Sequence, residues 1–190
     1  MIKRVVLGLA AGALIAVCGF AYLQHEQPGW WVRLNHPLSY RAEVVGYAHI
    51  YHLDPALVAA VIYEESRFRS DARSSAGAIG LMQLLPSTAR GIAEHTGGKR
   101  FRVPQDLYVP DLNIRYGCWY LHHLEQKYAG RPGAVDLALA AFNAGQSNVD
   151  AWIAATAAGK PVRLRFTATR DYVSDVRAAQ RLYRRAYDLR

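Results

Sequence analysis

The residue best suited to chemistry is Glu65, which follows an apolar segment at residues 57–63. That segment predicts a buried helix, so a carboxyl at its end emerges from a low-dielectric environment. Burial disfavours the charged form of a carboxyl and raises its pKa. A carboxyl with a raised pKa can act as a general acid near neutral pH, for example by protonating a glycosidic oxygen. The alternative is a helix that ends in a solvated Glu64-Glu65 pair.

A turn of small residues and an amide follow the acid. Gln83 lies 18 residues after Glu65, at the end of the segment 80–83. Its amide can offer both a donor and an acceptor to an N-acetyl or hydroxyl group. Gly77 and Gly80 permit positive φ or a close backbone approach, which a sugar-binding turn would use. The spacing therefore favours one acid that faces a turn in a sugar cleft.

Further residues repeat a recognisable order and spacing along the chain. They are Glu65-Ser66, Phe68, Ala72, Ser74, Gly77-Ala78, Gly80-Leu81-Met82-Gln83 and Pro86-Ser87-Thr88-Ala89, then Asn113-Ile114, Gly117 and Tyr120-Leu121, then Ala141-Phe142-Asn143-Ala144-Gly145 with Val149, and finally Ala168-Thr169-Arg170-Asp171-Tyr172-Val173. Together they resemble the catalytic domain of soluble lytic transglycosylases, relatives of goose-type lysozyme that cut bacterial peptidoglycan. The matches span about residues 54–176. The resemblance implies an all-α, lysozyme-like single domain.

The resemblance also implies roles for five side chains. Glu65 would be the catalytic acid, and Ser74, Gln83, Asn143 and Tyr172 would bind substrate. Ser74 would lie near the acid and hydrogen-bond it, or it is an ordinary turn serine. Asn143 would contact substrate or cap the end of its helix. Tyr172 would close the cleft through its hydroxyl or pack in the core.

Two positions depart from the family pattern. Phe142 stands where the family has a tyrosine, and Ala168 stands where it usually has a glutamate. Each departure removes a polar group that normally lines the sugar cleft. Since Glu65 is retained, we expect an enzyme of altered or modest activity on an unchanged fold.

Only one acid sits at a matched catalytic position, although glycosidases usually pair two carboxyls. Glu64 is adjacent to Glu65 in the sequence, so on a helix it points about 100° away. A single acid suffices if the substrate supplies the nucleophile. The resemblance implies cleavage between N-acetylmuramic acid and N-acetylglucosamine, with closure of the muramoyl C6 hydroxyl to a 1,6-anhydro end. The alternatives are hydrolysis by water, as in goose-type lysozymes, and a wall-binding or assembly-scaffold protein that lost activity.

Composition supports one folded domain with appendages. The chain has 190 residues, of which 52% are hydrophobic and 20% charged, and a net charge of +8. A basic protein can bind nucleic acid, anionic lipid or an acidic polymer. Because no nucleic-acid motif accompanies the charge, we expect no nucleic acid as a partner. The anionic bacterial wall would be a sufficient partner, and the alternative is an Arg-rich solvated surface. The resemblance implies peptidoglycan strands as the partner. His122 and His123 are neighbours that share no helix face, so we expect no metal and no cofactor.

The N-terminal region predicts a membrane segment. Lys3-Arg4 precede an uncharged stretch at residues 5–23, which as a helix would span about 28 Å. Basic residues before the stretch predict a single-pass anchor within residues 1–23 and a catalytic domain outside the cytoplasm. The alternative is a signal peptide cleaved near Gly19-Phe20-Ala21, which would give a secreted protein. Residues 24–37 are expected to be a linker and residues 38–190 the catalytic domain.

From residue 38 onward every strong hydrophobic period is helical. Asp54 and Pro55 are expected to supply the N-cap and first residue of the helix that carries Glu65. Ser87, Asp111 and Thr169 are expected to cap three later helices.

Overall fold

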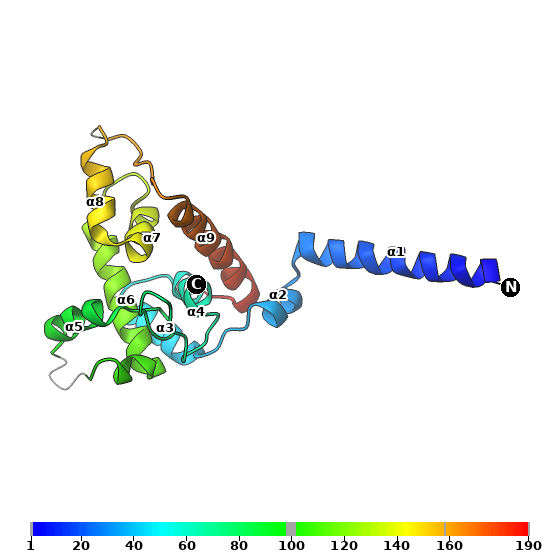
Figure 1. Ribbon diagram of the computed structural model, residues 1–190, viewed down its shortest axis with the longest axis horizontal. Helices are drawn as coiled ribbons and strands as arrows, with labels where there is room; N and C mark the ends of the chain where they lie inside the picture. The colour runs from blue at the N-terminus through cyan, green and yellow to red at the C-terminus, as the bar shows by residue number, and fades with distance from the viewer. Residues whose placement is uncertain (1, 98–101, 158, 190) are drawn as a thin grey trace.

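The regular structure consists of helices (Figure 1). The computed structural model describes residues 2–97, 102–157 and 159–189, with side chains from residue 12 onward. Its α-helices are α1 (Ile2–Glu26), α2 (Gly29–Asn35), α3 (Arg41–Ile50), α4 (Pro55–Ser66), α5 (Pro86–His95), α6 (Pro110–Lys127), α7 (Ala134–Ala144), α8 (Gln146–Ala154) and α9 (Thr167–Tyr187), with a 3₁₀ helix η1 (Gln105–Tyr108) before α6. Extended pairing among the described residues is limited to isolated bridges of Ile79 with Arg73 and Leu84. The predicted all-α class is confirmed.

Helix α4 lies at the centre of the domain because it is apolar on all sides. Its residues 55–62 are all buried, and it packs against α9 and α3. The start of α4 is the predicted one: the Asp54 carboxylate accepts a hydrogen bond of 2.9 Å from the amide of Ala56, and Pro55 is the first helical residue. A buried central helix gives the acid at its far end a fixed position.

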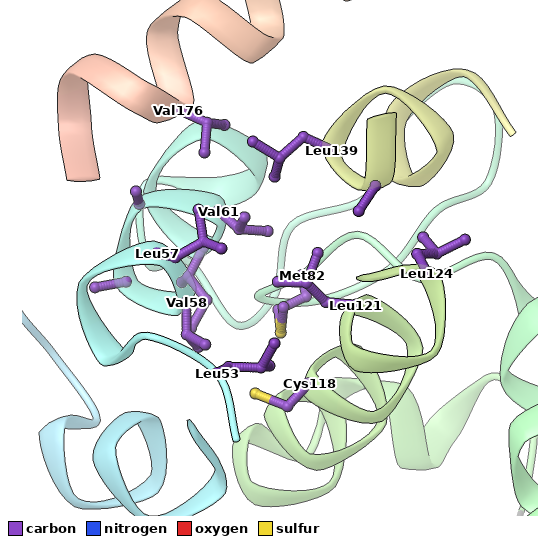
Figure 2. Close-up of a cluster of buried hydrophobic side chains, with 14 of the residues drawn as sticks. Leu53, Leu57, Val58, Val61, Met82, Cys118, Leu121, Leu124, Leu139 and Val176 are labelled. Carbon is purple, nitrogen blue, oxygen red and sulfur yellow. The ribbon is translucent and has the colours of Figure 1, made fainter. Parts of the chain in front are cut away.

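The core around α4 joins helices that are distant in the sequence. Figure 2 shows Leu57, Val58 and Val61 of α4 beside side chains of the later helices. Met82 reaches this core from the turn that follows α4 and is fully buried. Gly117 of α6 leaves the room for it, since a Cβ there would lie 2.2 Å from the Met82 sulfur. The turn is thereby packed against α6.

Three predicted helix caps are wrong. Helix α5 begins at Pro86 and α6 at Pro110, each one residue before the expected cap, Ser87 or Asp111. Proline is preorganised for the first helical position and needs no amide partner there, so it sets the start. Thr169 also lies inside its helix, because α9 begins at residue 167.

The N-terminal residues form helix α1, which extends away from the rest of the chain (Figure 1). Among the residues that the structure describes, none of the helices is long and apolar enough to cross a bilayer, so the predicted transmembrane helix is not supported. The predicted linker at residues 24–37 contains α2, which packs against α9 and buries Val32. The Tyr187 hydroxyl also lies 2.9 Å from the carbonyl of His36, to which it donates. Side-chain contacts therefore order this segment.

Candidate active site

The position of Glu65 is set by the way α4 ends. The helix stops at Ser66, and Arg67 caps it in the left-handed conformation with φ of 53°. The buried Ser66 hydroxyl donates a hydrogen bond of 2.8 Å to the carbonyl of Leu81 in the following turn. This bond ties the last turn of α4 to the turn that lies beside it. The carboxyl of Glu65, one residue earlier, is therefore held on a rigid element.

Glu65 meets the first turns of α9. The Tyr172 hydroxyl donates a hydrogen bond of 2.7 Å to the Glu65 carboxylate, across 107 residues of sequence. Burial raises the pKa of the Glu65 carboxyl to about 7, the bond from Tyr172 opposes the rise, and the charge of Glu64 adds to it. A carboxyl with a pKa near 7 is populated in both protonation states at neutral pH. It can therefore give up a proton and take one back.

The adjacent glutamate has a different environment. Glu64 forms an ion pair of 3.2 Å with Arg67, and Arg67 also stacks over the Tyr63 ring. Burial raises the pKa of Glu64, while the charge of Arg67 lowers it. The two neighbouring carboxyls thus have separate partners, as their helical spacing predicts. Glu65 is the one bonded to a neutral hydroxyl.

In the turn at residues 71–85, polar side chains form hydrogen bonds with the backbone of the turn itself. The Ser74 hydroxyl accepts a hydrogen bond of 3.0 Å from the amide of Ala78, so the structure places this serine in a turn. The Gln83 amide nitrogen donates to the carbonyls of Gly80 (2.9 Å) and Ala72 (3.2 Å). What Gln83 can still offer a ligand is its carbonyl oxygen, an acceptor.

Asn113 of α6 holds this turn in place through hydrogen bonds to its backbone. Its side chain is fully buried, accepts from the amide of Met82 at 2.8 Å and donates to the carbonyls of Ile79 and Leu107 at 2.9 Å each. Gly80 has φ of +80°, and a Cβ there would lie 2.3 Å from the Asn113 amide nitrogen. Glycine is therefore required at this point of the turn.

Asn143 of α7 is linked through α9 to the surroundings of Glu65. Its side-chain oxygen accepts a hydrogen bond of 3.0 Å from the hydroxyl of Thr169, which is buried. Thr169 and Tyr172 are three residues apart, so they share one face of α9. One helix face thus holds both Asn143 and Glu65. Asn143 does not cap its helix: α7 ends at Ala144, and the C-cap is Gly145 with φ of +88°.

A cavity of about 190 Å³ lies between the turn and the end of α7. Its walls include the predicted residues Gln83 and Asn143, with Phe142, Thr88 and Tyr120. Phe142 packs at 5.6 Å, between ring centres, on the Tyr120 ring. Phe142 thus shares this cavity with the polar side chains of Gln83, Thr88 and Asn143. The other departure, Ala168, is exposed in the first turn of α9.

A larger cavity lies elsewhere in the described part of the chain. It measures about 630 Å³ and is bounded by the start of α7, the segment 161–164 and α9, including Asp136, Val173 and Arg177. Val173 and Arg177 lie about 100° and 140° around the helix from Tyr172. This cavity therefore opens on another side of α9, away from Glu65.

Sequence reasoning missed three residues of the site: Thr88, Tyr120 and Thr169. Each belongs to a matched motif. For Thr88 and Tyr120 the sequence predicts no further role, and for Thr169 it predicts only a helix cap. The missed signal is that Thr169 lies three residues before Tyr172. Two polar residues at that spacing near a helix start face the same neighbour.

Comparison with known proteins matches residues 44–163 to the family described as "Transglycosylase SLT domain". The soluble lytic murein transglycosylase of Salmonella typhimurium is 29% identical over 78% of this chain and 23% of its own length. The membrane-bound lytic murein transglycosylase E of Buchnera aphidicola is 30% identical over 65% of this chain and 60% of its own length.

Among solved structures, the lytic transglycosylase Slt of Pseudomonas aeruginosa, crystallised as an inactive glutamate-to-glutamine mutant, superposes with a TM-score of 0.73. It is 31% identical, and the match covers 95% of this chain and 29% of that one. The chain thus spans about a quarter of the Salmonella and Pseudomonas proteins.

Proposed function

Because the chain belongs to the transglycosylase SLT domain family, we propose that it cleaves the β-1,4 bond between N-acetylmuramic acid and N-acetylglucosamine in peptidoglycan. The observation that carries the proposal is the Glu65 carboxyl, which has a pKa raised to about 7 and a hydrogen bond from Tyr172. The inactive state of the glutamate-to-glutamine mutant of the Pseudomonas relative supports an essential glutamate.

In the first step, protonated Glu65 donates its proton to the glycosidic oxygen. The bond from that oxygen to C1 of the muramoyl unit breaks, and N-acetylglucosamine leaves with a free hydroxyl. Positive charge develops at C1, and the Glu65 carboxylate is now close to it. Tyr172 keeps a hydrogen bond to this carboxylate, which favours its charged form.

In the second step, the Glu65 carboxylate accepts the proton of the muramoyl C6 hydroxyl. The C6 oxygen bonds to C1, which gives the 1,6-anhydro end and restores protonated Glu65 without consuming water. Glu64 is paired with Arg67 and Asp71 is exposed, whereas Glu65 accepts a hydrogen bond from a neutral hydroxyl. A nucleophile from the substrate fits this arrangement better than a second protein carboxyl.

The departures at Phe142 and Ala168 fit a modest rate. Asn143, Gln83 and Phe142 line the cavity of about 190 Å³ and would contact the glycan. Ser74 would act indirectly, by shaping the turn through its bond to Ala78. Because peptidoglycan lies outside the cytoplasm, the domain would act there.

A digest of purified sacculi tests the proposal. Wild-type protein is incubated with sacculi, and the released muropeptides are analysed by mass spectrometry. We expect 1,6-anhydro ends, which are lighter than reducing ends by one water. Reducing ends alone would establish hydrolysis by water and overturn the anhydro mechanism. Binding to sacculi without any release would indicate a wall-binding or scaffold protein.

A further inference from the structure

The segment between α8 and α9 has the side-chain pattern of a β-strand but no strand partner. Residues 161–166 connect the two helices and have no regular secondary structure (Figure 1). Val162 and Leu164 are half-buried and pack on the core, whereas Arg163 and Arg165 are exposed. Side chains alternate in this way along a β-strand that has one face covered.

The backbone amides of this segment are available for pairing with another chain. The amides of residues 162–165 donate no hydrogen bond to any residue that the structure describes. The Arg170 guanidinium of α9 holds the segment from its carbonyl side, donating to the carbonyls of Leu164 at 2.9 Å and Arg165 at 3.2 Å. Phe166, at the end of the segment, has extended backbone angles, with φ of −85° and ψ of 128°. The segment is therefore an anchored edge with unused donors.

The cavity of about 630 Å³ lies beside this segment. Residues 161–164 form one wall, and the start of α7 and the side of α9 form the others. Leu137 and Val173 contribute apolar surface to it. Asp136 is the one acidic residue that lines the described part of the cavity, and it is paired with Arg177 at 2.8 Å. Unused amides beside an apolar groove suit a peptide strand, whose backbone pairs with the amides and whose alternate side chains enter the groove.

The charge of the segment indicates the kind of peptide. Lys160, Arg163 and Arg165 are exposed, and none of them forms an ion pair within the described part of the chain. Pairing with the same segment of a second copy would bring arginines opposite one another, which is destabilising. A nucleic acid would satisfy the charge but leave the apolar walls uncovered. An acidic peptide strand satisfies the charge, the amides and the walls together.

We propose that the groove between residues 161–165 and α9 docks an extended acidic segment of a partner protein, which adds to the chain as a β-strand. Carboxylates of the docked strand meet Arg163 and Arg165, and its apolar side chains enter the cavity beside Leu137 and Val173. The cavity opens away from Glu65, so the docked strand leaves the acid accessible. The inference goes beyond cleavage, because it gives the domain a surface through which another protein positions it.

Binding of a synthetic peptide to the full chain tests this proposal. The probe is a fluorescein-labelled heptapeptide of alternating glutamate and valine, and its dissociation constant is measured by fluorescence anisotropy. Two matched probes separate the contributions. One carries lysine in place of glutamate, and the other is N-methylated along its backbone, which blocks strand pairing but keeps the charge. We expect each change in the probe to weaken binding about tenfold or more.

Charge reversal in the protein gives the complementary measurement. Arg163→Glu should weaken binding of the acidic probe about tenfold and improve binding of the lysine probe. Arg90→Glu, at an exposed position on α5, is the matched control with the same change in net charge, and it should alter binding by about twofold or less. Arg163→Glu should digest sacculi at the wild-type rate, since docking does not involve the acid.

Equal binding of the N-methylated probe would overturn the proposal, because the site would then recognise charge alone. The proposal would also be overturned by an equal loss in Arg90→Glu, or by no binding of the acidic probe up to about 1 mM. Displacement of the probe by stem peptides released from sacculi would assign the groove to the wall instead of a partner protein. The N-methylated probe needs no protein variant, so it decides even where Arg163→Glu does not fold. Uncut sacculi would count against the proposed function and leave these binding results unchanged.

Discussion

The turn at residues 71–85 and the junction of α4 with α9 both carry family residues, but they use their polar groups differently. In the turn, Ser74 and Gln83 bond to the backbone. At the junction, Glu65 is half-buried, meets a single hydroxyl and has a raised pKa. A motif match therefore predicts where a side chain lies, whereas its hydrogen-bond partners determine whether it stabilises the fold or is available for chemistry.

Exchange of the acid should have the largest effect. Glu65→Gln preserves size but cannot donate the catalytic proton, so the rate of muropeptide release should fall by ~10²-fold or more. Glu64→Gln is the matched control on the same helix, because its carboxyl pairs with Arg67, and it should retain activity. Equal losses in both variants would show that the two carboxyls do not differ in role.

Restoring the missing hydroxyl should produce a gain. Phe142 lines the cavity beside Asn143, so Phe142→Tyr adds a donor where the glycan would lie. Turnover should rise by a few-fold to ~10²-fold, the range of one well-placed donor, with little change in melting temperature. Phe166→Tyr, at an exposed ring before α9, serves as the control. A destabilised Phe142→Tyr protein with unchanged turnover would show that this side of the cavity is dry.

Removal of the Tyr172 hydroxyl should shift the pH dependence. The bond from Tyr172 favours the charged form of Glu65, so Tyr172→Phe should raise the pKa of the acid further. The acid then stays protonated to higher pH, and the falling alkaline limb of the rate profile moves upward. The loss of one hydrogen bond should also lower the rate by roughly tenfold. A limb that stays in place or moves downward would contradict this reading of the pair.

The smallest effect on chemistry should come from the turn. Ser74→Ala removes a local hydrogen bond to Ala78 and should cost about 1 kcal/mol of stability. The rate for the folded protein should change by less than threefold or so, since Ser74 acts through turn geometry. The free energy of unfolding in urea and the digest rate are the two readouts. A rate loss close to that of Glu65→Gln would move Ser74 into the catalytic group.

Much of the fold follows from local patterns. The apolar run of α4, with Asp54 and Pro55 at its start, predicts a buried helix that presents Glu65 at its end. Local patterns failed where two signals competed: Pro86 and Pro110 set the helix starts in place of the expected side-chain caps. Helix α2 has only seven residues and is held by α9, a contact that no local pattern contains.

The sequence predicts the environment of Glu65 but not the pairings within the candidate site. The apolar sequence of α4 predicts a raised pKa for Glu65, because the buried helix and the acid at its end are adjacent in the sequence. The bonds of Tyr172 to Glu65 and of Thr169 to Asn143 join residues 107 and 26 apart in the sequence. Only the packing of α9 on α4 and α7 brings these pairs together. For the same reason the sequence did not distinguish the turn role of Ser74 from a role at the acid.

Titration of the carboxyl itself tests the central claim most directly. Protein with ¹³C-labelled glutamate side chains is titrated by NMR, and the Glu65 signal is identified by its loss in Glu65→Gln. That signal should titrate near pH 7, as the raised pKa of Glu65 requires. A Glu65 signal with a midpoint near 4.5, the ordinary value for a glutamate, would contradict the account of Glu65 as a general acid at neutral pH.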